Sequence, residues 1–167
     1  ELGLFGVIIP EEYGGLGLDL TTYVLIQIEL SRGWMSLSGV LNTHFIVAYM
    51  IRQHGTDEQK QRFLPRMATG EVRGAFSMSE PELGSDVAAI RTRAKRTADG
   101  NYTIDGQKMW LTNGGSSTLV AALVLRLASS QAGSAPGFGG RVPLLKALSF
   151  QRSAISQSTF ELHSSTF

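Results

Sequence analysis

The amino-acid sequence predicts an α+β fold, in which an N-terminal helical portion is followed by an antiparallel β portion that is incomplete. Two observations support this prediction. Apolar residues recur at helical spacing up to residue 54. After Gly70 the pattern changes to short extended segments that are separated by turn residues.

Three helices are expected in the N-terminal half. Residues 20–30 are apolar nearly all round, which predicts a buried helix that ends near Gly33. Residues 36–54 place their apolar side chains on one helical face and predict a second helix. The capping pattern Thr56-x-x-Gln59 begins a third helix, which Pro65 is expected to bend or shorten.

The second half is expected to form strands. Asp99-Gly100-Asn101 is a typical hairpin turn and lies between two extended segments. Lys108, in one of these segments, is interpreted as a solvated strand residue. The predicted extended segments are residues 73–78, 90–96, 102–109 and 119–127.

Composition excludes several classes of protein. The 167 residues carry 15 Lys+Arg and 14 Asp+Glu, so no excess of positive charge favours nucleic acid or an anionic membrane as partner. The longest apolar run, residues 45–51, is far shorter than the ~20 residues of a membrane-spanning helix, so no transmembrane segment is predicted. The absence of cysteine excludes disulfides and thiolate ligands and fits a reducing compartment, so a cytoplasmic location is expected.

Charge is distributed unevenly, which predicts three regions. Residues 1–117 hold 24 of the 29 charged side chains. We therefore predict a partial helical domain over residues 1–71, a partial β domain over 72–128 and an atypical tail over 129–167. The tail holds nine Ser in 39 residues, which is typical of disorder or of a shifted reading frame. Because residue 1 is Glu, the chain is interpreted as a fragment or a processed product.

Two sequence motifs carry the functional prediction. AFSMSEPELGSD (75–86) and GQKMWLTNG (106–114) resemble the two signature stretches of the acyl-CoA dehydrogenase family of flavoproteins. PEEYGGLG and TDEQKQRFLPRMATGE extend the resemblance over residues 1 to about 124. The family has a helical N-terminal domain, a middle β domain and a helical C-terminal domain. The resemblance therefore implies part of the first domain, a portion of the second and none of the third.

The resemblance implies an FAD-dependent enzyme that removes hydrogen from the α and β carbons of an acyl-CoA thioester, with hydride transfer to flavin N5. An acyl-CoA substrate, an electron-transfer flavoprotein-type acceptor and a homo-oligomeric full-length protein are also implied. In a eukaryote the expected location is the mitochondrial matrix. The family's glutamate base belongs to the C-terminal domain, so no catalytic residue is assigned here, and neither Glu80 nor Glu82 takes that role. The chain by itself is expected to be inactive and to bind FAD weakly or not at all.

The same resemblance assigns the flavin-facing residues. The main chain near Met78 and the Ser79 hydroxyl would face the pyrimidine edge of the flavin, Thr112 would lie near N5, and Trp110 would pack on the ring. Ser85 would also lie near the pantetheine end of the substrate, where Gly84 permits close approach. The expected cofactor-binding residues are Phe76, Met78, Ser79, Gly84, Ser85, Trp110, Leu111 and Thr112.

The chain departs from the family at Glu82-Leu83, where the family often has Gly and a small residue, which places a bulkier and charged loop beside the expected ligands. The segment Ser79-Glu80-Pro81 by itself also fits a simple strand-to-turn transition. His44 and His54 are interpreted as structural residues, since no acidic or Cys partner lies at ligand spacing, and no metal site is predicted. The sequence 14–17, Gly-Gly-Leu-Gly, is interpreted as a loop because it lacks the third Gly and the βαβ setting of a dinucleotide fingerprint.

Two alternative functions stay open. A truncated, non-catalytic family member would serve as a CoA-ester or protein-binding module. An oxygen-using relative would be an acyl-CoA oxidase or a flavin monooxygenase.

Overall fold

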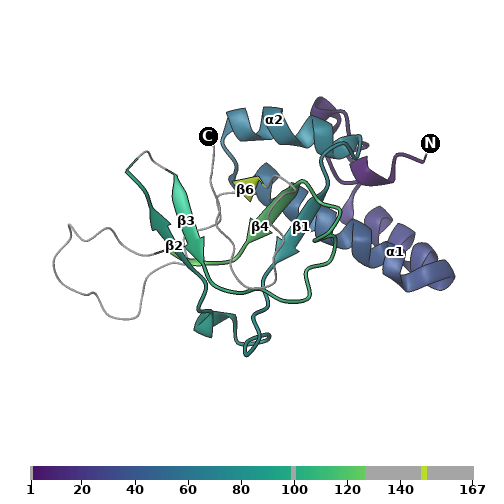
Figure 1. The fold of residues 1–167 in the computed structure, drawn as a ribbon. Coiled ribbons are helices and arrows are strands. Elements are labelled where there is room, and N and C mark those ends of the chain that lie inside the picture. Colours follow the sequence, from purple (N-terminus) through teal and green to yellow (C-terminus); the bar gives the residue numbers. More distant parts are fainter. Residues whose placement is uncertain (1, 99–100, 127–147, 150–167) are drawn as a thin grey trace. The chain divides into compact units, whose positions relative to one another are not determined.

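The computed structural model describes residues 2–98, 101–126 and 148–149 (Figure 1). The chain forms two compact units. The first contains residues 1–76 and 112–121, and the second contains residues 77–111 and 122–167. The described elements are the 3₁₀ helices η1 (Leu4–Gly6), η2 (Glu11–Tyr13) and η3 (Val87–Ala89), the helices α1 (Leu20–His54) and α2 (Asp57–Ala68), and the strands β1 (Gly74–Ser77), β2 (Arg93–Arg96), β3 (Tyr102–Asp105), β4 (Leu119–Ala122), β5 (Leu125–Arg126) and β6 (Leu148–Ser149).

Helix α1 is interrupted at Trp34. The Asp19 carboxylate accepts a hydrogen bond from the Thr22 N–H at 2.8 Å and caps the first turn. At Trp34 the backbone leaves the helical region, with φ −160° and ψ 104°. The break directly follows Gly33, so the prediction of two successive helices is confirmed.

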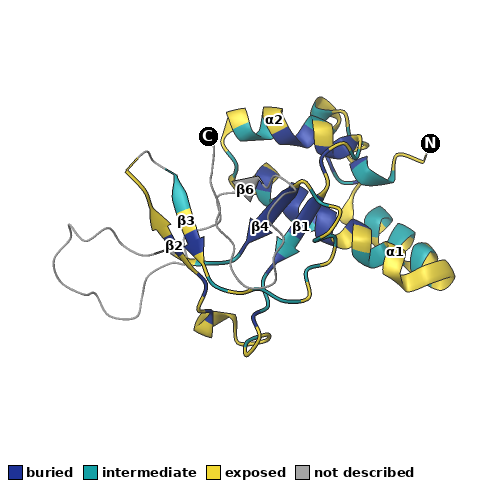
Figure 2. Cartoon of the chain, viewed as in Figure 1, coloured by how far each residue is buried: buried dark blue, intermediate teal, exposed yellow. Residues whose placement is uncertain are grey.

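The predicted full burial of residues 20–30 is wrong. Tyr23, Ile26 and Leu30 pack against the core formed by Val7, Leu41 and Phe45. The opposite face of the same segment is exposed. Figure 2 shows yellow, exposed stretches along α1, including its outer end. An apolar sequence predicts which side chains need cover but not which element covers them. The exposed apolar side chains on this segment are Leu20, Val24, Leu25 and Ile28.

Helix α2 begins as predicted. The Thr56 hydroxyl accepts from the Gln59 N–H at 3.2 Å, and the Gln59 side chain accepts from the Thr56 N–H at 3.0 Å, which completes a capping box. The helix continues past Pro65 to Ala68, so Pro65 does not end it. Gly70 then adopts φ 79°, a conformation that favours glycine.

Three contacts attach α1 to β1 within the first unit. The Gly74 N–H donates to His44 Nδ1 at 3.2 Å, and the Phe76 N–H donates to the Thr43 hydroxyl at 2.9 Å. The Asn113 amide donates to the carbonyl oxygens of Val40 and Gly74 at 2.9 and 3.3 Å. His44 is fully buried, and this burial lowers its pKa to about 4 although backbone hydrogen bonding works in the opposite direction. The structural interpretation of His44 therefore fits its place in the core.

The predicted antiparallel sheet is confirmed only in part. Strands β2 and β3 pair antiparallel, with Arg93 opposite Asp105, as expected for the predicted hairpin. Strand β5 pairs with β2 in parallel, contrary to the prediction. Residues 106–109 are not a strand, because the backbone turns at Gly106 with φ 145°. The small core of this sheet is formed by Ala94 and Ile104 with Tyr102 and Val124 packed against them.

Other predictions fall partly or wholly outside the described residues. The turn residues Asp99 and Gly100 are among these, as is the tail 129–167 except for β6. The loop at residues 14–17 is confirmed. Gly14 and Gly17 have φ of 77° and 60°, and a Cβ on Gly15 would lie 2.0 Å from the Ile9 carbonyl oxygen.

By length and composition α1 is long and apolar enough to cross a membrane. A core helix of a soluble protein has the same properties, and the second half of α1 buries Leu41, Phe45 and Ile51. One such helix is weak evidence for a membrane span.

Candidate functional site

The two sequence motifs meet in the second unit. The Met109 N–H donates to the Ser79 carbonyl oxygen at 2.9 Å. The Lys108 ammonium group donates to the Met78 carbonyl oxygen at 3.0 Å. Because both contacts use main-chain atoms of the first motif, the second motif fixes the path of the backbone at residues 78–79.

Glu80 lies at the centre of this arrangement. Its Oε2 accepts from the Arg91 N–H at 2.7 Å, and its Oε1 accepts from the Thr92 N–H at 2.9 Å and the Thr92 hydroxyl at 2.6 Å. The Lys108 ammonium also donates to Oε1, at 2.9 Å. Four donors thus converge on one buried carboxylate, which is the arrangement that makes burial of a charge tolerable.

The hydrogen bonds decide the charge of Glu80. Burial by itself raises the pKa of this carboxyl, whereas the hydrogen bonds from Thr92, from the main chain of Arg91 and Thr92, and from Lys108 lower it. The net effect lowers the pKa to about 2. Glu80 is therefore ionised at neutral pH and is a weak proton acceptor there.

The prediction that Lys108 is a solvated strand residue is wrong. Only 6% of its side chain is exposed, against 5% for its partner Glu80. The strand ends at Asp105, and after the turn at Gly106 the chain runs toward the first motif. The sequence signal for this pair was the presence of acidic residues in the first motif and of a single charged residue, Lys108, in the second.

A tight turn follows Glu80. The Glu80 N–H donates to the Leu83 carbonyl oxygen at 2.8 Å, and the Leu83 N–H donates back to the Glu80 carbonyl oxygen at 3.1 Å. Glu82 projects from this turn and pairs with Arg91 at 2.6 Å, with both side chains mostly exposed. The bulkier Glu82-Leu83 is therefore accommodated by a self-contained turn and a surface ion pair.

Comparison with known proteins places this arrangement in a family. The description "Acyl-CoA dehydrogenase, N-terminal domain" matches residues 1–71, and "Acyl-CoA dehydrogenase, middle domain" matches residues 75–141. The chain belongs to the acyl-CoA dehydrogenase family. It is 44% identical over 116 residues to the mitochondrial isovaleryl-CoA dehydrogenase of Solanum tuberosum, which corresponds to 68% of this chain and 28% of that protein.

Solved structures of the family agree. An acyl-CoA dehydrogenase of Bacillus anthracis complexed with FAD matches with a TM-score of 0.68 and 36% identity, over 75% of this chain and 22% of that one. A prolyl acyl carrier protein oxidase matches with a TM-score of 0.64 and 31% identity, over 73% of this chain and 33% of that one. The chain thus spans about a third or less of the length of these acyl-CoA dehydrogenase relatives.

The residues that the family resemblance assigns to FAD are divided between the two units. Phe76 and Thr112 belong to the first unit. Within the second unit, the Met109–Ser79 hydrogen bond brings the segments around Met78 and Trp110 together. The assigned residues in the second unit are Met78, Ser79, Gly84, Ser85, Trp110 and Leu111.

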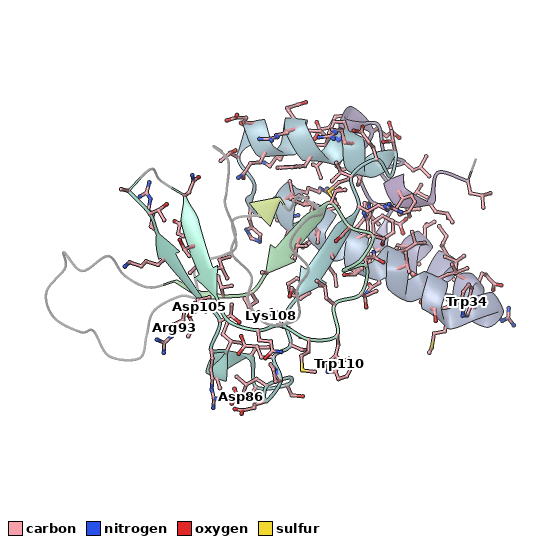
Figure 3. All side chains as sticks on the ribbon, viewed as in Figure 1. Trp34, Asp86, Arg93, Asp105, Lys108 and Trp110 are labelled. Atoms are coloured by element: carbon pink, nitrogen blue, oxygen red, sulfur yellow. The ribbon has the colours of Figure 1, made fainter. Side chains whose placement is uncertain are left out.

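Trp110 has two unusual properties. Its side chain is 81% exposed, and its backbone φ is 57° (Figure 3). Among the described non-glycine residues only Trp110 and Asn113 have positive φ. A large exposed indole on a strained backbone is a feature of ligand-binding segments.

Gly84 and Ser85 lie on the exposed loop after the turn at Glu80. A Cβ added at Gly84 would meet no atom of the described residues within 4 Å, so none of these residues requires glycine at that position for space. Within the described ranges no group of three or more His, Cys, Asp or Glu side chains is arranged to hold a metal ion. The described residues thus offer hydroxyl, main-chain and aromatic groups for a ligand.

Proposed function

We propose that this chain supplies the cofactor-facing part of an FAD-dependent acyl-CoA dehydrogenase. The reaction is removal of hydrogen from the α and β carbons of an acyl-CoA thioester, with hydride transfer to flavin N5. The observation that carries the proposal is the direct connection of the two motifs, through Met109 and Ser79 and through Lys108 and Met78. Membership of the family and the FAD-complexed relative support it.

The available groups fit a flavin. An isoalloxazine ring needs a flat apolar surface and a few fixed donors and acceptors along its pyrimidine edge. The exposed Trp110 indole offers the first, and the half-buried Ser79 hydroxyl with the main chain at Met78 offers the second. Phe76 and Thr112, which belong to the first unit, are assigned to FAD by the family resemblance alone. Bound FAD would supply the hydride acceptor, while these residues bind and orient it.

The chain by itself is proposed to lack the catalytic base. The buried Glu80 carboxylate has a pKa of about 2 and is engaged by four donors, so it cannot serve as the base. Glu82, the other acid of the motif, is paired with Arg91 at the surface. We place the base in the family's C-terminal helical domain, on which the flavin contacts and the contacts between subunits of a homo-oligomer also draw.

The same proposal includes the partners and the location. An acyl-CoA, with Ser85 near its pantetheine end, would be the substrate, and an electron-transfer flavoprotein-type protein would accept the electrons. In a eukaryote the location would be the mitochondrial matrix, as in the mitochondrial potato relative.

Flavin binding is tested with two tryptophan variants. Trp110→Ala is expected to weaken FAD binding by about tenfold in a longer protein that contains this chain and a family C-terminal domain, because an aromatic contact is worth roughly 1 kcal/mol beyond its buried area and part of that area is lost as well. The measurement is quenching of flavin fluorescence during titration. Trp34→Ala is the matched control, since Trp34 is also exposed, at 65%, but lies on α1 (Figure 3). Equal effects of the two substitutions would contradict the assignment of Trp110.

Catalysis is tested separately. The chain with FAD and an acyl-CoA, under anaerobic conditions, is expected to show no bleaching of the flavin absorbance. A longer protein that contains this chain and a family C-terminal domain is expected to bleach. Bleaching by the chain alone would overturn the placement of the base.

The oxidase-type relative favours a second candidate, transfer of electrons to oxygen. Hydrogen peroxide formation by the longer protein in air would identify an oxidase, and its absence together with reduction of an electron-transfer flavoprotein would identify a dehydrogenase. FAD retention without turnover by the longer protein would identify a non-catalytic binding module.

A further inference from the structure

Glu80 and Lys108 form a buried pair that the proposed chemistry does not use. We infer that they are positioning residues: Lys108 sets the flavin-facing main chain at Met78 and Ser79, and Glu80 ties that main chain to the loop that carries Gly84 and Ser85. This inference rests on the proposed function for the identity of the ligand. The positioning itself rests on contacts within the second unit.

The evidence for Lys108 is its pair of acceptors. Its ammonium group donates to the Met78 carbonyl oxygen and to Glu80 Oε1, at 3.0 and 2.9 Å. The next residue, Met109, donates its N–H to the Ser79 carbonyl oxygen. Residues 78–79 are therefore held on two successive carbonyl oxygens by two successive residues of the second motif. Trp110 follows immediately, so the same contacts position the main chain from which the indole side chain projects.

The evidence for Glu80 is the range of segments that it joins. Its carboxylate accepts from the main chain of Arg91 and Thr92, which closes the loop of residues 80–92 at its far end. Its own main chain pairs with Leu83 at the near end. The loop with Gly84 and Ser85 is thus closed by one residue at both ends. In the described part of the chain, the hydrogen bond that joins the side chain of this residue to the second motif comes from Lys108.

This asymmetry separates the two residues in their effects. Loss of the Lys108 ammonium leaves three hydrogen bonds to the Glu80 carboxylate, so the loop stays closed while the main chain at Met78 loses its donor. Loss of the Glu80 charge weakens both connections. If the pair contributed only to general stability, its loss would accelerate amide exchange in both segments alike, because the whole second unit would be destabilised.

The experiment measures amide exchange on the full 167-residue chain by NMR. In Lys108→Met, exchange at the Met109 N–H is expected to accelerate by about tenfold, with the amides of Arg91 and Thr92 changed much less. In Glu80→Gln, all three amides are expected to accelerate. The double variant Glu80→Gln/Lys108→Met carries no unpaired buried charge, so it keeps the test available where a single variant folds poorly. It is expected to accelerate all three amides as well.

Ile104→Val is the control for general destabilisation. Ile104 is buried in the core of β2 and β3. It takes part in none of the hydrogen bonds of Glu80, Lys108 and Met109 described above. This variant is expected to accelerate exchange over the whole second unit in proportion. Unchanged exchange at Met109 in Lys108→Met, or the proportional pattern of Ile104→Val, would overturn the inference.

FAD titration of the same variants supplies the link to the ligand. Lys108→Met and Glu80→Gln are each expected to weaken FAD binding by about tenfold, and Ile104→Val is expected to leave it unchanged. Selective amide acceleration with unchanged FAD affinity would overturn the flavin-positioning role. Because the chain by itself is expected to bind FAD weakly or not at all, this titration is made on the longer protein that contains this chain and a family C-terminal domain. Failure of that protein to bind FAD would overturn the proposed function, while the amide pattern of the 167-residue chain still decides whether the pair positions the main chain.

Discussion

Glu80 shows how a single side chain acquires a fixed charge from its surroundings. Without partners, a carboxyl as buried as this one would favour the neutral acid. The two main-chain N–H groups, the Thr92 hydroxyl and the Lys108 ammonium reverse that preference. The same contacts that exclude Glu80 as a base make it a source of pH-dependent stability.

The free energy of unfolding is expected to fall in acid because of Glu80. The pKa of this carboxyl is about 2 in the folded chain and 4.5 in the unfolded chain, so its contribution is present above pH 4.5 and is lost as the pH falls toward 2. The loss is about 3 kcal/mol. Urea unfolding of wild type and of Glu80→Gln/Lys108→Met between pH 2 and 6 measures it, and the variant should show a flatter dependence below pH 4.5.

His44 acts mostly at higher pH and is present in both proteins, so it does not obscure the comparison between wild type and variant. Its pKa is about 4 in the folded chain and 6.5 in the unfolded chain, so its contribution is lost between pH 6.5 and 4. Equal slopes for wild type and variant between pH 4.5 and 2 would contradict the assigned role of Glu80.

At the residue level, a motif can single out a residue but does not show the surroundings of its side chain. Ser79 and Trp110 could be singled out by motif, whereas the burial of Lys108 could not be predicted from the local pattern. Its partner Glu80 lies 28 residues away along the chain. A prediction of burial from the alternation of side chains also requires that the strand continue past Gly106, where the backbone turns instead. Long-range pairing of charges is not encoded in local periodicity.

At the level of elements, local signals were reliable and pairing was not. The break after Gly33 and the cap at Thr56 are determined by neighbouring residues, and both were predicted. The parallel pairing of β5 with β2 was not, because strand direction depends on how distant segments are connected. The exposure of one face of α1 was missed because the segment that covers an apolar face is also distant in the sequence.

The cap of α2 gives a direct test of a local signal. Thr56→Ala is expected to lower the free energy of unfolding by about 1 kcal/mol, because the Gln59 N–H loses its acceptor. Thr56→Ser keeps the hydroxyl and is expected to change little. Thermal unfolding followed by circular dichroism compares the two, and similar losses in both variants would show that packing of the Thr56 methyl group, not the cap, is responsible.

At the level of the whole molecule, the chain presents apolar surface that it does not cover within its described residues. Leu20, Val24, Leu25 and Ile28 are all at least 46% exposed on the first part of α1. Their spacing places them on one helical face. A soluble chain that presents such a face is prone to associate through it.

Self-association of the isolated chain is therefore expected at micromolar concentration. Leu25→Gln/Ile28→Gln should increase the monomer fraction in sedimentation velocity, with the fold kept because both side chains are exposed by about half. Ser36→Gln, an exposed position on the same helix, is the control. An unchanged monomer fraction in the double variant would show that this face does not mediate association.

The first compact unit is assembled from two separate stretches of chain, and this determines the order in which it can form during synthesis. Residues 112–121 supply Asn113, whose side chain bridges Val40 and Gly74, and most of β4, which is hydrogen-bonded to β1. When a ribosome has released only residues 1–76, β1 has no neighbouring β4 and the Val40 carbonyl has no donor from Asn113. This stretch must therefore wait for a further 45 residues of nascent chain, from 77 to 121, and its unpaired strand edge is exposed during that delay.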